Sequence, residues 1–127
     1  MLEGFERYNY SIGTSSITLS DNGVAFSKTA VIKMNKCEYV VLLINYSERK
    51  LAIKKCDQEE EGAIAFYNSS KKLVSVRWNN RELQKTLSNL MGWELKDGVA
   101  YKIDGTYSHE DEALIFDLNQ GEKITTK

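Results

Sequence analysis

Alternating hydrophobic and polar residues near the start of the chain predict a β-hairpin followed by a short helix. Two alternating segments, 17–19 and 24–26, flank Asp21-Asn22-Gly23. An Asn-Gly pair in this setting is a strong hairpin signal, since a type I′ turn needs positive φ at both central positions. Ser27 can then cap a helix over residues 28–35, with Ala30, Val31 and Met34 directed inward. Upstream, alternating Tyr8, Tyr10 and Ile12 indicate a further strand or an ordered N-terminal arm.

The most apolar segment of the chain, residues 38–46 (EYVVLLINY), predicts the first strand of a second hairpin. Its two alternating faces are both apolar, which is typical of a strand at the centre of a sheet. After a short turn, residues 50–56 alternate again, and this predicts a partner strand with Lys50 and Lys54 on its solvent face. The short loop would pair Tyr46 with Leu51, and therefore Val41 with Cys56.

The two cysteines, Cys37 and Cys56, are expected to be free thiols. In that register, Cys37 lies four residues along the strand from the partner of Cys56, or about 13 Å away. A disulfide requires Cα atoms within about 7 Å of each other. Two free thiols are typical of a protein in a reducing compartment.

The second half of the chain contains the clearest helical pattern. Residues 80–91 place Leu83, Leu87, Leu90 and Met91 on one stripe, after an N-cap at Asn79 or Asn80 and before a stop at Gly92. We expect this stripe to cover the apolar strand at residues 40–43. Alternation predicts strands over residues 73–78, 99–105 and 113–118.

The two halves share one order of elements: strand, helix, strand, strand. Residues 17–56 and 72–118 therefore predict a pseudo-duplicated β-α-β-β unit, although their residue identity is negligible. The expected fold class is α+β, with mostly antiparallel sheet and two helices. A chain of 127 residues in which 42% are hydrophobic is typical of one globular domain, residues 1–127.

The sequence also indicates where the protein is located in the cell. The longest apolar run has five residues, from Val40 to Ile44, whereas a membrane span needs about 20. The N-terminus has no apolar core of a secretory signal, so we expect a cytoplasmic protein without a membrane partner.

Catalytic and metal-binding patterns are weak. The single histidine, His109, stands in a predicted loop beside three acidic residues, and the chain has no second histidine to complete a zinc site. Glycine-rich phosphate loops and nucleophile elbows do not occur. The acidic segment 57–62 is typical of a solvated connector. We therefore expect neither an enzyme nor a bound metal or cofactor.

Basic residues are concentrated in the middle of the chain. The net charge is −1, yet residues 24–95 carry twelve basic and eight acidic side chains, a net charge of +4. Such a region favours phosphate contacts, with exposed tyrosines available for base stacking. An ordinary solvated surface is the alternative, since the whole protein has no basic excess. The candidate nucleic-acid contacts are Lys28, Lys33, Lys50, Lys54, Arg77 and Arg81.

Several segments carry resemblances to known groups of proteins. SITLSDNGVAFSKTAVIKM, EYVVLLINYSERKLAIKKC and the later LMGW, YKIDGTY and ALIFDL resemble small proteins of integrative elements and prophages of Gram-positive bacteria. That resemblance implies a mobile-element setting but no particular activity or site residues. Residues 17–55 are also similar in outline to AbrB-type DNA-binding domains, without the proline usual at the helix start.

The sequence favours two functions, ahead of a hydrolytic or transferase enzyme as a third. The leading hypothesis is a non-catalytic regulatory module of a mobile element that binds nucleic acid through residues 28–85. The alternative is a protein-binding modulator or inhibitor of a host or phage enzyme, to which near-neutral charge and seven tyrosines are equally suited.

Overall fold

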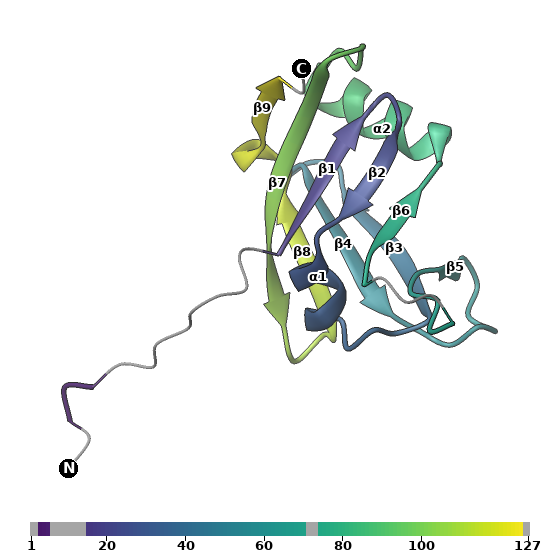
Figure 1. Ribbon diagram of the computed structural model, residues 1–127, viewed down its shortest axis with the longest axis vertical. Helices are drawn as coiled ribbons and strands as arrows, with labels where there is room; N and C mark the ends of the chain where they lie inside the picture. The colour runs from purple at the N-terminus through teal and green to yellow at the C-terminus, as the bar shows by residue number, and fades with distance from the viewer. Residues whose placement is uncertain (1–2, 6–14, 71–73, 126–127) are drawn as a thin grey trace.

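The computed structural model describes residues 3–5, 15–70 and 74–125, which adopt a mixed α and β fold (Figure 1). One curled sheet of nine antiparallel strands dominates this part of the chain, and two α-helices accompany it. The expected α+β class with two helices is confirmed at this level. The strand expected over residues 8–12 lies outside the described residues. Neither described helix has the length and apolar character needed to cross a membrane.

The first half of the chain has the predicted order of elements. Two hairpins enclose a short helix: β1 (Ser16–Ser20) and β2 (Gly23–Phe26), then α1 (Lys28–Lys33), then β3 (Tyr39–Asn45) and β4 (Lys50–Lys55). The Ser27 hydroxyl caps α1 by accepting a hydrogen bond of 3.2 Å from the Ala30 amide, as expected.

The first hairpin has the predicted position but a different turn. Neither Asp21 nor Asn22 has a positive φ, so the turn is not of type I′. Gly23 has the positive φ, at 139°, and pairs with Ser20. A Cβ atom at Gly23 would lie 2.4 Å from the Trp78 carbonyl oxygen, so glycine is required here by the close approach of the next strand along the sheet.

The second half contains the predicted strands and two short ones that the pattern does not reveal. It comprises β5 (Ile64–Ala65), β6 (Val76–Trp78), α2 (Arg81–Met91), β7 (Val99–Ser108), β8 (Ala113–Asp117), the 3-10 turn η1 (Leu118–Gln120) and β9 (Glu122–Thr125). The unpredicted strands are β5 and β9. Each is at most four residues long, too short for a clear alternation.

Helix α2 has the predicted caps and the predicted inner face. The Asn80 side chain accepts from the Leu83 amide at 3.0 Å, and Gly92 ends the helix at a φ of 71°. Leu83 and Leu87 are buried. The helix backbone lies beside β2, and the Gln84 side chain donates a hydrogen bond of 2.7 Å to the Ser20 carbonyl.

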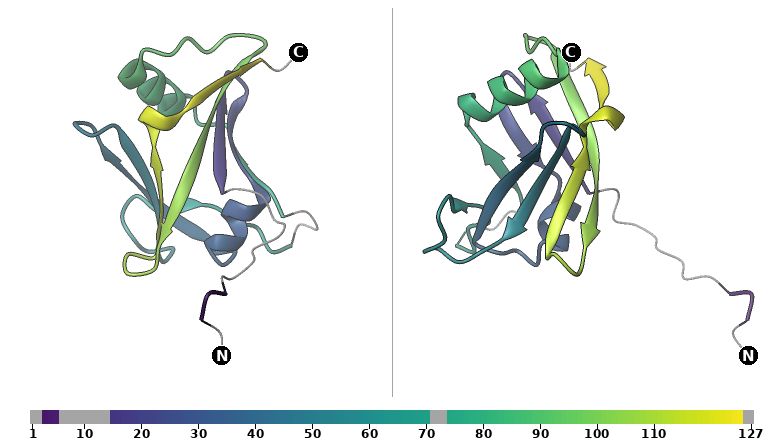
Figure 2. Two further views of the ribbon diagram at one scale, coloured as in Figure 1. Left: turned by 90° about the vertical axis from the view of Figure 1, so that its left-hand side faces the viewer. Right: turned by 180° about the vertical axis from the view of Figure 1, so that it is seen from behind.

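The sheet curls until its two ends meet. Its strand order is β5-β3-β4-β8-β7-β1-β2-β6, with β9 paired to β7 (Figure 2). At the ends of this order, the Trp78 indole of β6 donates a hydrogen bond of 3.0 Å to the Ala65 carbonyl of β5. Phe26, Phe66 and Trp78 pack edge to face behind this contact, with ring centroids 4.8–6.2 Å apart. The core therefore fills the interior of a nearly closed barrel.

Strand β3 is not the central strand that its composition predicts. One side pairs with β4 along its whole length, but the other side pairs with β5 only at Tyr39 and Val40. The segment from Leu42 to Asn45 is therefore an edge. The apolar residues on its two faces therefore do not indicate a paired strand on each side. One face is buried against the core, and the other is a hydrophobic outer face.

The register of the β3–β4 hairpin also differs from the expected one. Asn45 pairs with Lys50 across a four-residue loop, so Val41 pairs with Lys54 and not with Cys56. The Cys56 amide instead donates to the Tyr39 carbonyl, at 3.1 Å. Cys37 thus lies two residues, not four, beyond the partner of Cys56. Both thiols are free.

Candidate binding surface along β3

The six basic residues predicted to contact nucleic acid fall on three separate parts of the structure. Lys28 and Lys33 are exposed on α1, at one end of the barrel (Figure 1). The second pair, Lys50 and Lys54, points outward from β4. The third, Arg77 and Arg81, lies on β6 and at the first turn of α2.

Strands β4 and β6 stand on opposite walls of the curled sheet (Figures 1 and 2). Leu51 and Ile53 point into the barrel from β4, and Val76 and Trp78 do so from β6. Because side chains alternate along a strand, the basic residues of β4 and Arg77 of β6 point outward, away from one another. The lysines of β4 also have partners on the protein. Lys50 forms an ion pair of 3.4 Å with Glu48, and the Lys54 ammonium donates to the Asp111 carbonyl at 2.5 Å.

A more continuous feature is the unpaired backbone of β3. Alternate residues of an antiparallel strand direct their N–H and C=O groups to opposite sides. Tyr39 bonds toward β4, whereas the Glu38 carbonyl accepts from the Phe66 amide on the other side, at 2.7 Å. By this alternation, Leu42 and Ile44 direct their backbone groups toward the outer side, where no described residue pairs with them. We call the backbone of these two residues the β3 edge.

Apolar side chains lie on both faces of the β3 edge. Leu42 and Ile44 point inward and are half-buried against the core, while Val41 and Leu43 point outward. Leu43 is 48% exposed, a large fraction for a leucine within a strand. The strand from Tyr39 to Asn45 contains no charged residue and no proline, the features with which natural proteins usually protect an edge from pairing.

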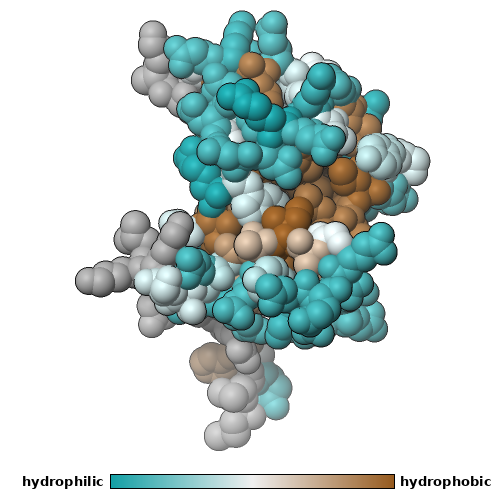
Figure 3. All heavy atoms as spheres, turned by 90° about the vertical axis from the view of Figure 1, so that its right-hand side faces the viewer, coloured by the Kyte–Doolittle hydropathy of each residue, from teal (hydrophilic) through white to brown (hydrophobic). Residues whose placement is uncertain are grey.

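The face of the molecule on the β3 and β6 side is hollowed and apolar at its middle (Figure 3). An apolar band crosses this face between hydrophilic upper and lower parts. Several hydrophobic side chains pack against the core but are only partly buried. They include Leu42 and Ile44 of β3, Ile64 of β5, and Leu90 and Met91 of α2. The barrel is therefore closed at the Trp78–Ala65 contact, but it is less completely covered beside the β3 edge.

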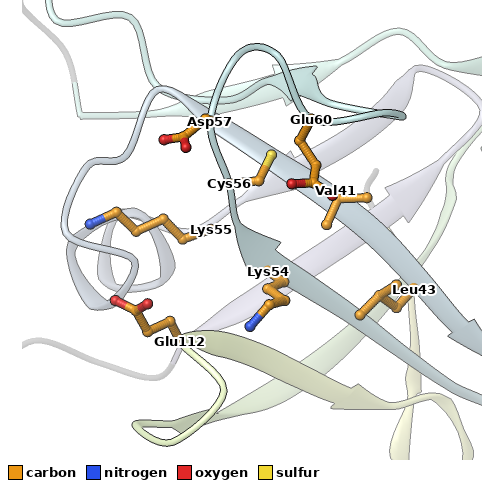
Figure 4. A pocket seen from close by; sticks show the side chains of 8 residues that line it. All are labelled: Val41, Leu43, Lys54, Lys55, Cys56, Asp57, Glu60 and Glu112. Carbon is orange, nitrogen blue, oxygen red and sulfur yellow. The ribbon is translucent and has the colours of Figure 1, made fainter.

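A pocket of about 500 Å³ lies on the outer face of β3 and β4 (Figure 4). We call it the Glu60 pocket. Its floor is apolar, formed by Val41 and Leu43, and charged residues surround that floor. The complete lining is Val41, Leu43, Lys54, Lys55, Cys56, Asp57, Glu60 and Glu112.

The thiols near this pocket are poor nucleophiles. Burial raises the pKa of Cys37 to about 11. Burial, together with the carboxylates of Glu60 and Asp57, raises the pKa of Cys56 as well. Because the thiolate is the reactive form, both side chains are mainly unreactive thiols at neutral pH. Within the described part of the chain, no group of three His, Cys, Asp or Glu residues could hold a metal ion.

Only an indirect signal for this surface is present in the sequence. The composition of the acidic segment 57–62 indicates a solvated connector, although this segment contributes Glu60 to the pocket wall. The indirect signal is the composition of residues 39–45, an apolar strand without a charged residue or a proline.

Comparison with known proteins identifies no relative of this chain. No family model, curated protein or solved structure matches it.

Proposed function

We propose that the chain is a non-catalytic protein-binding module, which receives an extended segment of its partner along the β3 edge. The observation that carries the proposal is the unpaired backbone of Leu42 and Ile44, flanked by apolar side chains on both faces. Strand addition satisfies such an edge with main-chain hydrogen bonds and uses alternate side chains for specificity. In this role the protein acts as a modulator or inhibitor of its partner. The same proposal includes that the chain is encoded by a mobile element.

The lack of protection along β3 supports this choice over an ordinary surface strand. An exposed apolar edge without charge or proline tends to pair with other chains. Retaining Leu43 at 48% exposure is therefore a liability unless a partner covers it.

A pull-down with matched variants tests the proposal. The bait is the intact chain, exposed to a Gram-positive lysate after nuclease treatment. Leu43→Lys puts a charge beside the β3 edge, while the control Ile32→Lys changes a similarly exposed residue (40%) on α1. We expect protein partners that bind the wild type and Ile32→Lys but not Leu43→Lys. Partners that bind Leu43→Lys as well as they bind the wild type contradict the proposal. So do partners that bind only when the lysate has not been treated with nuclease.

Nucleic-acid binding is the second candidate, supported by the exposed lysines of α1. Lys28, Lys33 and Lys36 lie on or directly after this helix, which has no acidic residue in its first turn. Fluorescence anisotropy with duplex and single-stranded DNA at low salt tests it. Non-specific binding typically has dissociation constants of about 1–100 µM, so no binding in that range excludes this candidate.

The pseudo-duplication of residues 17–56 and 72–118 is also part of what we propose. It is supported by the pairing of corresponding strands, β2 with β6 and β4 with β8, both antiparallel. Ala25 opposite Arg77 and Ala52 opposite Ile115 are the middle pairs of these two ladders, as expected around a twofold axis. Homologous sequences test the idea: residues related by the repeat should be more alike than residues at random offsets.

A further inference from the structure

We infer that the segment added along the β3 edge carries a lysine or arginine, flanked at alternate positions by apolar residues, and that this basic side chain enters the Glu60 pocket. The inference rests on the proposed function and specifies the chemistry of the partner. Its basis is the position of the pocket, the charges around it and the alternation of side chains in a strand.

The pocket and the β3 edge share the same strand. Val41 and Leu43 form the apolar floor of the pocket, and they alternate with Leu42 and Ile44, whose backbone groups form the edge. The loop before β5 passes close to this floor, since a Cβ atom at Gly62 would lie 3.6 Å from a methyl group of Val41. A strand bonded to the edge therefore holds its outward side chains beside the floor and near Glu60.

The charges of the pocket favour a cation. Its lining has three carboxylates, Asp57, Glu60 and Glu112, against the two ammonium groups of Lys54 and Lys55. Lys54 already donates to the Asp111 carbonyl, and the side chain of Lys55 extends away from Glu60 (Figure 4). Glu60 lies beside Val41 and forms no ion pair with any described residue. An incoming guanidinium or ammonium group can pair with it.

The shape of the pocket favours a long basic side chain over a short polar one. Lysine and arginine have apolar stems, which can pack on Val41 and Leu43 while the charged head reaches a carboxylate. The neighbouring positions of the added strand point to the inner face, toward Leu42 and Ile44, and require apolar side chains. The expected ligand pattern is thus apolar, basic, apolar.

Selection from a displayed library of random ten-residue peptides, with the intact chain as target, tests the inference. We expect the selected peptides to share a lysine or arginine between two apolar residues. For one such peptide, anisotropy should show affinity reduced by about 2- to 5-fold in Glu60→Gln, because exposed ion pairs contribute modestly. Glu61→Gln is the matched control, since Glu61 is exposed in the same loop but does not line the pocket.

Charge reversal makes the test specific. Glu60→Lys should weaken the basic peptide further and should restore binding to a peptide in which glutamate replaces the basic residue. A merely structural role of Glu60 would not produce this exchange of preference. Selected peptides without a basic residue, or unchanged affinity in Glu60→Gln, overturn the inference.

The outcomes also separate the inference from the proposed function. If Leu43→Lys abolishes peptide binding while Glu60→Gln has no effect, strand addition stands and the basic ligand does not. If Leu43→Lys leaves peptide binding unchanged, or if the library yields no binder, both fail. If sedimentation shows a dimer that Leu43→Lys dissociates, the occupant is a second copy of the chain and the inference is overturned.

Discussion

The indole nitrogen of Trp78 lies 3.0 Å from the carbonyl oxygen of Ala65, and this hydrogen bond joins the two ends of the sheet. Backbone pairing does not close the barrel there, because β5 has two residues and β6 has three. A side chain therefore completes the closure, and the aromatic rings of Phe26 and Phe66 pack against it.

Replacing this indole should weaken the barrel. Trp78→Phe removes the donor, and the loss of this part-buried hydrogen bond to the Ala65 carbonyl should cost about 0.5–1.5 kcal/mol. Trp93→Phe is the control, since Trp93 is half-buried and stacks on Tyr101 with ring centroids 4.3 Å apart. Urea denaturation of both variants measures the difference. A Trp78→Phe midpoint equal to that of the wild type would show that the Trp78–Ala65 bond does not stabilise the fold.

The stripe of α2 should contribute strongly to stability, because Leu83 and Leu87 are buried. Leu87 is fully buried at the centre of the helix, so Leu87→Ala should lower the free energy of unfolding by about 2–5 kcal/mol. Lys85→Ala, at an exposed position of the same helix, should change it by less than about 0.5 kcal/mol. An unchanged midpoint for Leu87→Ala would mean that α2 does not belong to the core.

A glycine in β7 allows one core ring to approach the backbone. A Cβ atom at Gly105 would lie 2.6 Å from a ring carbon of Phe116, its cross-strand partner, which is fully buried. Gly105→Ala should therefore cost about 1–3 kcal/mol through overpacking. Thr106→Ala, at the next and exposed position, should be near neutral. Thermal denaturation decides, and a Gly105→Ala protein as stable as wild type would contradict the packing.

The buried thiol of Cys37 predicts a pH dependence of stability. Its pKa is raised from 9.0 to about 11 by burial, so the folded chain keeps the proton that the unfolded chain loses first. The stabilisation is fully present below pH 9 and is lost as the pH rises toward about 11. Denaturation midpoints should fall less steeply over this range in Cys37→Ala than in wild type. Identical pH profiles would show that the folded protein does not retain this proton.

Local patterns predict much of the fold because they act over a few residues. Ser27 and Asn80 cap their helices as expected, and the strands of both hairpins begin and end close to the predicted positions. Pairing between distant strands leaves no such local trace. Strand β3 has an edge because β5 pairs with it at only two residues. An apolar strand with one paired neighbour has the same sequence pattern as an apolar strand with two.

The candidate site is less predictable than the fold for the same reason. Basic residues in the same region of the sequence, such as Lys54 and Arg77, are separated by the curl of the sheet. The β3 edge consists of backbone groups, which no residue type reveals. Glu60 meets Val41 and Leu43 only because an acidic loop passes over a hairpin that precedes it in the chain.

Amide hydrogen exchange along β3 tests the central claim most directly. In the free protein, Leu42 and Ile44 direct their amides to the unpaired side, whereas Val41 and Leu43 donate to β4. NMR should therefore show faster exchange at Leu42 and Ile44 than at Val41 and Leu43, and a bound peptide or partner should slow only the first pair strongly. Contradictory results would be Leu42 and Ile44 amides that are already as protected as Leu43 in the free protein, or that stay unprotected in the complex.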